Sequence, residues 1–220
     1  MNRVHLIDCM EHMAATDDNY YDLAIVDPPY GIKAGAMNLG FSNSSNIKKS
    51  AWDGSIPDAC YFKELFRVSI NQIIWGRNYF TLPPSKCFIV WDKLEGMYNR
   101  SFSECEMAWG SYDMNAKIFK LAPNNLKDKK IHKTQKPIDL YKWLLQNYAK
   151  PGQTIFDSHV GSGSIRIACH DLGFEFEGCE IDADYYEAQE ARYQNHIKQS
   201  ELFDTDELQE LVFDNHNTQG

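Results

Sequence analysis

The sequence predicts an α/β fold built on a mostly parallel sheet. Three observations support this prediction: short apolar runs recur and several end at an acidic residue, amphipathic segments separate them, and a glycine-rich loop joins a strand-like run to a helix-like segment. Short apolar runs bounded by polar residues are typical of buried strands, and apolar positions three and four apart are typical of helices. The 220 residues suit one such domain, so a second domain is not required.

The chain begins with two predicted strands on either side of a short helix. The strands are residues 4–7 and 23–26, which end at Asp8 and Asp27, and the helix is 9–15. Because such crossovers are right-handed, both acidic ends are expected at the same edge of the sheet.

A rigid turn follows the second strand, since Asp27 is succeeded by Pro28, Pro29 and Tyr30. Prolines cannot continue a sheet ladder and they fix the local backbone. A carboxylate, exposed carbonyls and an aromatic ring therefore meet within four residues. Ligands of open α/β sheets bind beyond the carboxyl ends of the strands, so this turn is a candidate site. On these four residues alone, an ordinary turn with a capping carboxylate is an equal alternative.

Residues 31–50 are rich in Gly, Asn and Ser and leave directly from this turn. A long segment without periodicity inside a compact domain is usually functional or disordered. We expect a mobile loop that acts as a lid or substrate clamp and carries Lys33, Lys48 and Lys49.

The middle of the chain contains a further helix and several strands. The helix is 58–70, and the strands are 72–75 and 87–91. Segments 104–109 and 115–121 flank a Gly-Ser-Tyr-Asp turn and are predicted to pair as an antiparallel hairpin.

The charge of one segment differs from that of the whole chain. The formal net charge is −9, which argues against a general affinity for polyanions. Between residues 117 and 136, however, seven lysines stand against one aspartate. A solvated surface is the ordinary explanation, but we expect a contact with a polyanion, within a small target-recognition region at 96–135. The lysines assigned to this contact are Lys127, Lys129, Lys130 and Lys133, with Lys33, Lys48 and Lys49 of the loop.

The second half alternates helices and strands. A helix begins at Pro137, further helices are 165–169 and 185–197, and strands are 154–157 and 174–179. The loop Gly161–Ser164 lies between a strand and a helix, and Glu180 ends the next strand. This arrangement suits a nucleoside-bearing cofactor, with its anionic end at the helix N-terminus and its ribose at Glu180. Arg166 stands where a dinucleotide fingerprint has its third glycine, which weakens an NAD interpretation.

The order of the elements predicts a circular permutation. A nucleotide-binding half-sheet needs strands on both sides of the glycine-loop strand, yet one predicted strand remains after that loop. The N-terminal strands can supply the missing neighbour.

The cysteines and the chain ends suggest a cytoplasmic protein. The six cysteines lack short paired spacings, which suggests reduced thiols and no zinc site, so no metal is expected. An apolar signal core and a membrane-spanning run are both missing from the sequence. We expect one domain over 1–200 and an acidic, partly disordered tail over 201–220.

The sequence resembles the permuted, or beta-type, amino-group DNA methyltransferases, in which Asp-Pro-Pro-Tyr precedes the cofactor loop. Besides the turn at Asp27, the similar segments are Ile7-Asp8-Cys9, residues 132–137 (His-Lys-Thr-Gln-Lys-Pro), residues 157–164 and residues 178–182. The departures from the family pattern are Lys133, Ser158, His159 and Ser164.

The resemblance implies a Rossmann-like sheet, S-adenosylmethionine as the cofactor and double-stranded DNA as the partner. The catalytic residues that it implies are Asp27, Pro28, Pro29 and Tyr30. The cofactor-binding residues that it implies are Asp8, Cys9, Asp27, His132, Lys136, Asp157, His159, Gly161, Ser162, Gly163, Ser164, Glu180 and Ile181.

The implied reaction is methylation of the N6 amine of adenine. Asp27 and the Pro28 carbonyl would accept the two N–H bonds of the amine, and Tyr30 would stack on a base flipped out of the duplex. Asp at position 27 favours adenine over the N4 amine of cytosine within the family. The alternatives are a cytosine-N4 enzyme, a silent DNA-binding module of the same fold, and a nicotinamide enzyme. Two further partners stay open as alternatives: a second copy of the chain, which would form a homodimer, and a restriction endonuclease.

Overall fold

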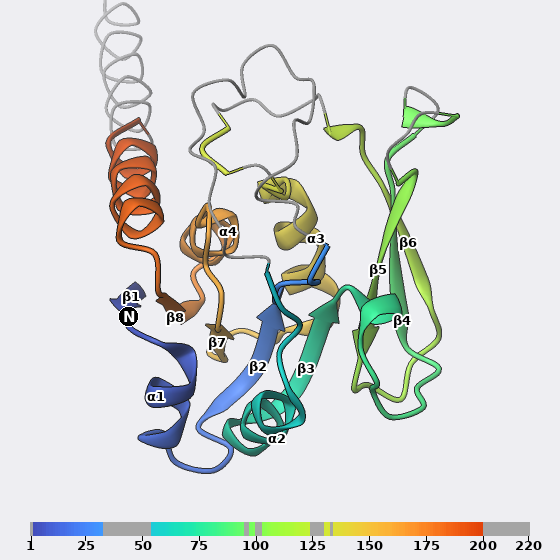
Figure 1. The fold of residues 1–220 in the computed structure, drawn as a ribbon. Coiled ribbons are helices and arrows are strands. Elements are labelled where there is room, and N and C mark those ends of the chain that lie inside the picture. The colour runs from blue at the N-terminus through green and yellow to red at the C-terminus, as the bar shows by residue number, and fades with distance from the viewer. Residues whose placement is uncertain are drawn as a thin grey trace, which may run out of the picture.

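The structure, a computed structural model, describes residues 2–32, 54–94, 97–99, 103–123, 130–132 and 134–199. Most of the predicted loop at 31–50 and the whole predicted tail at 201–220 therefore lie outside the described residues. The described part is an eight-stranded sheet with helices packed against both of its faces (Figure 1).

The sheet has a strand order that departs from the chain order. Its strands are β1 (Asn2–Leu6), β2 (Tyr21–Val26), β3 (Ser69–Trp75), β4 (Phe88–Asp92), β5 (Cys105–Gly110), β6 (Lys117–Lys120), β7 (Thr154–Asp157) and β8 (Glu175–Glu180). They lie side by side as β1-β8-β7-β2-β3-β5-β4-β6. The helices are α1 (Cys9–Ala14), α2 (Ala59–Val68), α3 (Ile138–Tyr148) and α4 (Ser164–Asp171), with a 3₁₀ turn η2 (Arg77–Tyr79) and a last helix over 183–199.

Alternate residues of β2 serve two separate cores. Leu23 and Ile25 pack in the core that contains α3 and α4, whereas Ala24 and Val26 pack in the core that contains α1 and α2. Successive side chains of a strand point to opposite faces, so a strand covered on both sides reads as a continuous apolar run. This explains why β2 could be predicted from sequence.

The predicted permutation is confirmed. The glycine-loop strand β7 pairs in parallel with β8 on one side and with β2 on the other, and β1 pairs in parallel with β8. The N-terminal strands thus complete the half-sheet around β7. Since these four strands run the same way, Asp8, which follows β1, and Asp27, which follows β2, lie at the same edge of the sheet, as predicted.

The predicted hairpin between residues 104–109 and 115–121 is wrong. The antiparallel partners of β5 are β3 and β4, while β6 pairs in parallel with β4, which lies between β5 and β6. The reason is burial: β4 is an apolar strand with Ile89 and Trp91 buried, and a central place satisfies it on both sides. The Lys117–Lys120 strand instead suits the sheet edge, and its Ile118 is exposed.

Arg166, at the position of the missing third glycine, is buried on α4. Its guanidinium donates to Asn2 Oδ1 at 2.7 Å and to Gln189 Oε1 at 2.9 Å, and it pairs with Glu190. It also lies 3.8 Å from the ring centroid of Tyr193. Arg166 therefore joins the first strand to the last helix. Among the described residues, the structure contains no helix that is long and apolar enough to cross a membrane.

Replacing Arg166 with methionine is expected to lower the free energy of unfolding by about 2–4 kcal/mol, because Gln189 and Glu190 lose a buried cationic partner. Urea denaturation of the variant measures this loss. Lys86→Met is the control, since the Lys86–Asp113 ion pair is exposed and should change stability by less than about 0.5 kcal/mol. Equal effects of the two substitutions would contradict the role of Arg166.

Candidate active site

Two groups hold the Asp27 carboxylate directly after β2. Lys136 Nζ donates to Oδ2, and the Tyr30 hydroxyl donates to Oδ1. Burial raises the pKa of Asp27, although the Lys136 ammonium acts in the opposite direction. The turn therefore presents an oriented carboxylate rather than a freely rotating one.

Lys136 also belongs to a row of alternating charges. Its ammonium, on a side chain that is 2% exposed, lies 3.2 Å from Glu106 Oε2, and Lys93 Nζ lies 2.8 Å from Glu106 Oε1. Burial lowers the pKa of Lys136, but Asp27 and Glu106 outweigh burial and raise it above its ordinary value. Burial would raise the pKa of Glu106, but the two ammonium groups lower it to about 2. The order Asp27, Lys136, Glu106, Lys93 thus alternates negative and positive charges.

Glu106 and Lys93 were not predicted as site residues. Lys136 was predicted as a cofactor-binding residue within the basic segment, whereas the structure places its ammonium on Asp27. An acidic residue within an apolar strand was the available signal, because carboxylates are rarely buried without a partner. Its partner could not be read from the sequence, since Lys136 is far from Glu106 along the chain.

Tyr30 belongs to a group of aromatic rings. Its ring stacks on that of Tyr79, with centroids 4.7 Å apart and planes inclined by 13°. The ring of Phe80 lies edge-on to that of Tyr30, with centroids 5.9 Å apart. Gly76 makes room for the ring: its φ is +79°, and a Cβ there would come within 2.2 Å of Tyr30 Cε1. A side chain at Gly76 would therefore displace Tyr30. Tyr79 and Phe80 were not predicted as site residues.

The last residue of β7 and the residues that follow it carry neutral polar groups in a buried setting. Burial raises the pKa of Asp157 to about 8, and its Oδ1 accepts a hydrogen bond from the His159 N–H at 3.0 Å. Burial lowers the pKa of His159 to about 4, so its ring is uncharged at neutral pH. The His159 ring lies edge-on to Tyr61, whose hydroxyl bonds Ser158 Oγ at 2.7 Å. His159 thus presents a flat neutral ring where the family pattern has phenylalanine.

Glu180 fastens the glycine loop to the end of β8. Its Oε2 accepts the Gly161 N–H at 2.8 Å, and its Oε1 accepts the Asp182 N–H at 2.9 Å. Gly161 and Gly163 both have positive φ, which favours glycine. Ile181 directly after Glu180 is 66% exposed, which is unusual for an isoleucine beside a buried carboxylate. An acid and an apolar surface therefore lie together at this strand end.

Asp8 and Cys9 lie beside Glu180, because the Ile7 N–H donates to the Glu180 carbonyl at 3.0 Å. The Asp8 carboxylate caps α1 through the Met10 N–H. Burial raises the pKa of the Cys9 thiol to about 12, so it is a packing group rather than a nucleophile.

Ser162 and Ser164 are held by a residue that the sequence analysis missed. Arg192 Nη1 donates to the Ser162 carbonyl at 2.6 Å and to Ser164 Oγ at 3.0 Å. The last helix therefore stabilises the loop from outside.

The segment 130–136 bridges the two predicted halves of the site. A Cβ built on Gly161 would lie 3.7 Å from His132 Cδ2, and Lys136, four residues further on, binds Asp27. The glycine loop and the Asp27 turn are also neighbours through the parallel pairing of β7 with β2. The structure thus brings together the acidic turn and the loop that sequence reasoning assigned to one site.

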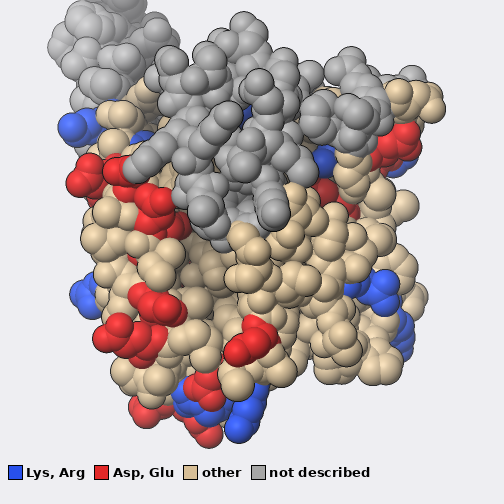
Figure 2. Space-filling view, in the orientation of Figure 1, with Lys and Arg blue, Asp and Glu red and all other residues tan. Residues whose placement is uncertain are grey.

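Of the lysines predicted to contact DNA, Lys130 is described, and burial lowers its pKa. The others lie outside the described residues: Lys33, Lys48, Lys49, Lys127, Lys129 and Lys133. On the face shown in Figure 2, acidic side chains gather along the left side with basic side chains between them, as the net charge of −9 leads one to expect.

Comparisons with known proteins find similarity to DNA methylases. A family model described as DNA methylase, N6_N4_Mtase, matches residues 90–191. The Type II methyltransferase M1.MboII of Moraxella bovis is 22% identical over 254 aligned residues, covering 84% of this chain and 94% of that protein.

Solved structures share the fold at low identity. The M1.HpyAVI–SAM complex has a TM-score of 0.56 at 18% identity, covering 87% of this chain and 100% of that chain. TTHA0409 of Thermus thermophilus, described as a DNA modification methylase and complexed with S-adenosyl-L-methionine, has a TM-score of 0.56 at 15% identity, with 89% and 94% covered. The cytosine-N4-specific PvuII DNA methyltransferase has a TM-score of 0.56 at 10% identity, with 86% and 85% covered. In its acidic turn, its glycine loop and this fold, the chain is similar to N6/N4 DNA methylases, and these similarities support DNA methylation with S-adenosylmethionine as the cofactor.

Proposed function

We propose that this DNA methyltransferase acts on the N6 amine of adenine in a specific DNA sequence. The observation that carries the proposal is the Asp27 carboxylate, oriented by Lys136 and Tyr30 at the end of β2, beside the glycine-loop strand β7. Within the family, an aspartate at this position favours adenine. Because its proposed substrate is DNA, we place the protein in the cytoplasm of a bacterial or phage-infected cell.

Asp27 can accept the substrate amine without losing its present partners. Each carboxylate oxygen has two lone pairs, so Oδ1 and Oδ2 can accept a further N–H while Tyr30 and Lys136 stay in place. The adenine amine is a poor nucleophile because its lone pair is delocalised into the ring. Acceptance of its N–H bonds by Asp27 and by the Pro28 carbonyl favours a pyramidal nitrogen aimed in one direction.

The aromatic group formed by Tyr30, Tyr79 and Phe80 fits a flipped base. The amine of a base inside the duplex is out of reach, and a base outside the stack needs an apolar surface to replace its neighbours. Tyr30 would supply this surface next to Asp27, and Tyr79 would hold the Tyr30 ring at a fixed inclination.

The residues at the ends of β7 and β8 fit S-adenosylmethionine. Glu180 suits ribose hydroxyls, the exposed face of Ile181 suits the adenine ring of the cofactor, and the positive-φ backbone of Gly161 allows close approach. Both oxygens of Glu180 already accept a backbone N–H, and their remaining lone pairs can accept hydroxyl groups. When bound, the cofactor supplies an electrophilic methyl group on a sulfonium.

We assign DNA contact to Lys33, Lys48, Lys49, Lys127, Lys129, Lys130 and Lys133. The segments that carry them leave from the Asp27 turn and precede Lys136, so they flank the proposed base site along the chain. A second copy of the chain and a restriction endonuclease stay candidate partners.

Incubating the protein with DNA and methyl-labelled S-adenosylmethionine, followed by nucleoside digestion and mass spectrometry, is expected to yield N6-methyladenine. In the same assay Asp27→Asn should lose at least about 100-fold in rate, because the neutral amide cannot stabilise the developing positive charge on the amine. Asp22→Asn, at the other end of β2, is the control, and its product yield should match that of the unaltered protein. N4-methylcytosine would overturn the substrate, and unlabelled DNA from an unaltered protein that binds S-adenosylmethionine would overturn the activity.

Glu106→Gln is expected to lower kcat about tenfold with little change in cofactor affinity. The glutamine no longer competes with Asp27 for the Lys136 ammonium, so the carboxylate is held in a changed position. Single-turnover kinetics and titration with cofactor separate the two quantities. Glu104→Gln, at the exposed residue just before the same strand, is the control. An unchanged kcat would show that Lys136 positions Asp27 without help from Glu106.

The contribution of Glu106 to the stability of the fold should decrease at acid pH. Because its pKa is lowered from 4.5 to about 2 in the folded protein, the carboxylate stabilises the fold fully above pH 4.5, and this contribution disappears as the pH falls toward 2. The difference in free energy of unfolding between the unaltered protein and Glu106→Gln should therefore shrink between pH 4.5 and 2. Urea denaturation at several pH values measures it, and a difference that stays constant across this range would contradict the low pKa.

A further inference from the structure

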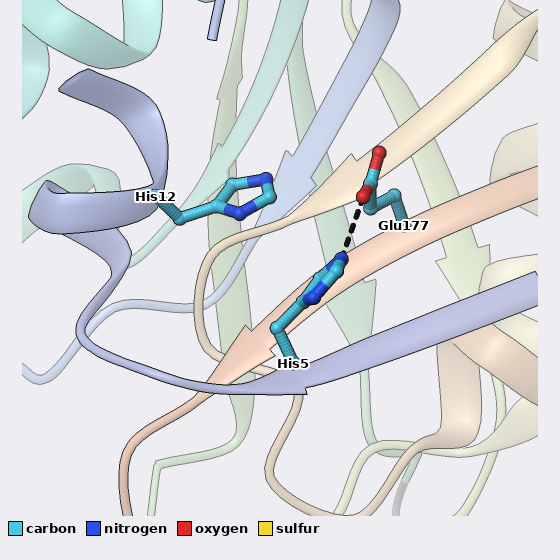
Figure 3. A group of neighbouring side chains, drawn as sticks. All are labelled: His5, His12 and Glu177. Atoms are coloured by element: carbon cyan, nitrogen blue, oxygen red, sulfur yellow. Dashed lines mark hydrogen bonds and ion pairs between the residues drawn. The ribbon is translucent and has the colours of Figure 1, made fainter. Parts of the chain in front are cut away.

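A second cluster of chemically active side chains lies away from Asp27. His5 of β1, His12 of α1 and Glu177 of β8 each offer one ligand atom, and these atoms all lie within 4.8 Å of one another. Figure 3 shows the His5 ring and the Glu177 carboxylate directed toward each other, with His12 reaching toward them from α1. Within the described ranges, this is the one group of three such residues that meets this limit.

The local fold explains why these residues meet. β1 and β8 are parallel neighbours, and the register that pairs Arg3 with Glu177 places His5 two residues further along. The chain then turns at Asp8 into α1, which carries His12 back over the sheet. The rings of His5 and His12 consequently lie 4.8 Å apart.

Hydrogen bonds link the cluster in a chain. His5 Nε2 lies 2.6 Å from Glu177 Oε1, and the Tyr21 hydroxyl donates to Glu177 Oε2 at 3.1 Å. His12 Nε2 lies 2.8 Å from the same hydroxyl. Tyr21 is buried and its ring stacks on Phe156, so this hydroxyl is fixed in position. The two imidazoles and the carboxylate thus lie close together, linked through the fixed Tyr21 hydroxyl.

We propose that His5, His12 and Glu177 bind a zinc ion. Two histidines and one glutamate form a donor set typical of zinc, and two ligands of a tetrahedral zinc ion lie about 3.3 Å apart, so modest side-chain rotations close the present spacing. Imidazole nitrogen also favours zinc over magnesium or calcium, which prefer oxygen ligands. A water molecule or the Tyr21 hydroxyl completes the coordination.

The ion would be structural. It would join β1, α1 and β8, whose ends carry Asp8 and Glu180, and it does not involve Asp27. The expectation of no metal rested on cysteine spacing, and this site contains no cysteine among its three ligands. The zinc site therefore shares no ligand residue with the Asp27 site, and zinc binding can be measured independently of methyl transfer.

The test uses the full chain without a polyhistidine tag, stripped with chelator and kept reduced. Isothermal titration with Zn²⁺ should show about one ion bound per chain, and bound zinc should raise Tm by at least about 3 °C. His12→Gln, which can keep a hydrogen bond to Tyr21, and His5→Gln should each weaken zinc binding more than about tenfold. Mg²⁺ should produce no shift in Tm.

His196→Gln is the matched control. His196 Nε2 also lies 2.6 Å from a carboxylate, that of Asp171, but this pair does not belong to a three-ligand group. The control should bind zinc like the unaltered protein. Absence of stoichiometric binding, or binding that the substitutions at His5 and His12 leave unchanged, would overturn the proposal. Circular dichroism of each variant verifies that it is folded, and the methylation assay gives an independent readout.

Discussion

The buried ammonium of Lys136 holds together parts of the chain that are far apart in sequence. It binds Asp27 after β2 and Glu106 on β5, and its own segment reaches His132 beside the glycine loop. A buried cation of this kind is tolerated because carboxylates compensate its desolvation, and removing one partner of such a pair typically costs about 3–5 kcal/mol. The position of the proposed catalytic carboxylate therefore depends on the same contact that joins three segments of the chain.

The permuted strand order gives that contact its geometry. Because β2 pairs with β7, the acidic turn and the glycine loop emerge side by side although more than half of the chain separates them. Arg166 occupies the position where a dinucleotide fingerprint has its third glycine. The buried guanidinium at that position connects α4 to the first strand and the last helix.

Much of this arrangement could be predicted from the sequence because it rests on local patterns. Continuous apolar runs identified β2, β3, β4 and β7. The permutation was predictable because too few strands follow the glycine loop to complete the sheet around β7. The turn at Asp27 was identifiable because two prolines fix its shape. These features depend on residues adjacent in the chain.

Other features depend on contacts between distant residues and could not be predicted in the same way. β6 pairs with β4 rather than with β5, so that the apolar strand β4 has a neighbour on both sides. The residues of the turn between β5 and β6 do not indicate which strand takes this central place, so the pairing could not be predicted from them. Glu106 acquires its role from Lys136, and Tyr79 acquires its role from Tyr30. His5, His12 and Glu177 meet only through the register of β1 with β8 and the return of α1.

The strand β6 at one margin of the sheet has a consequence for how the protein behaves in concentrated solution. An unpaired margin is a template on which another molecule can add a strand and begin a fibre. Among the described residues β6 is the outermost strand, and its exposed Lys120 would face the same residue of a second copy that added in parallel, so the two ammonium groups would repel each other. The protein thus has a local electrostatic barrier against aggregation, in addition to the repulsion between molecules that its overall negative charge provides.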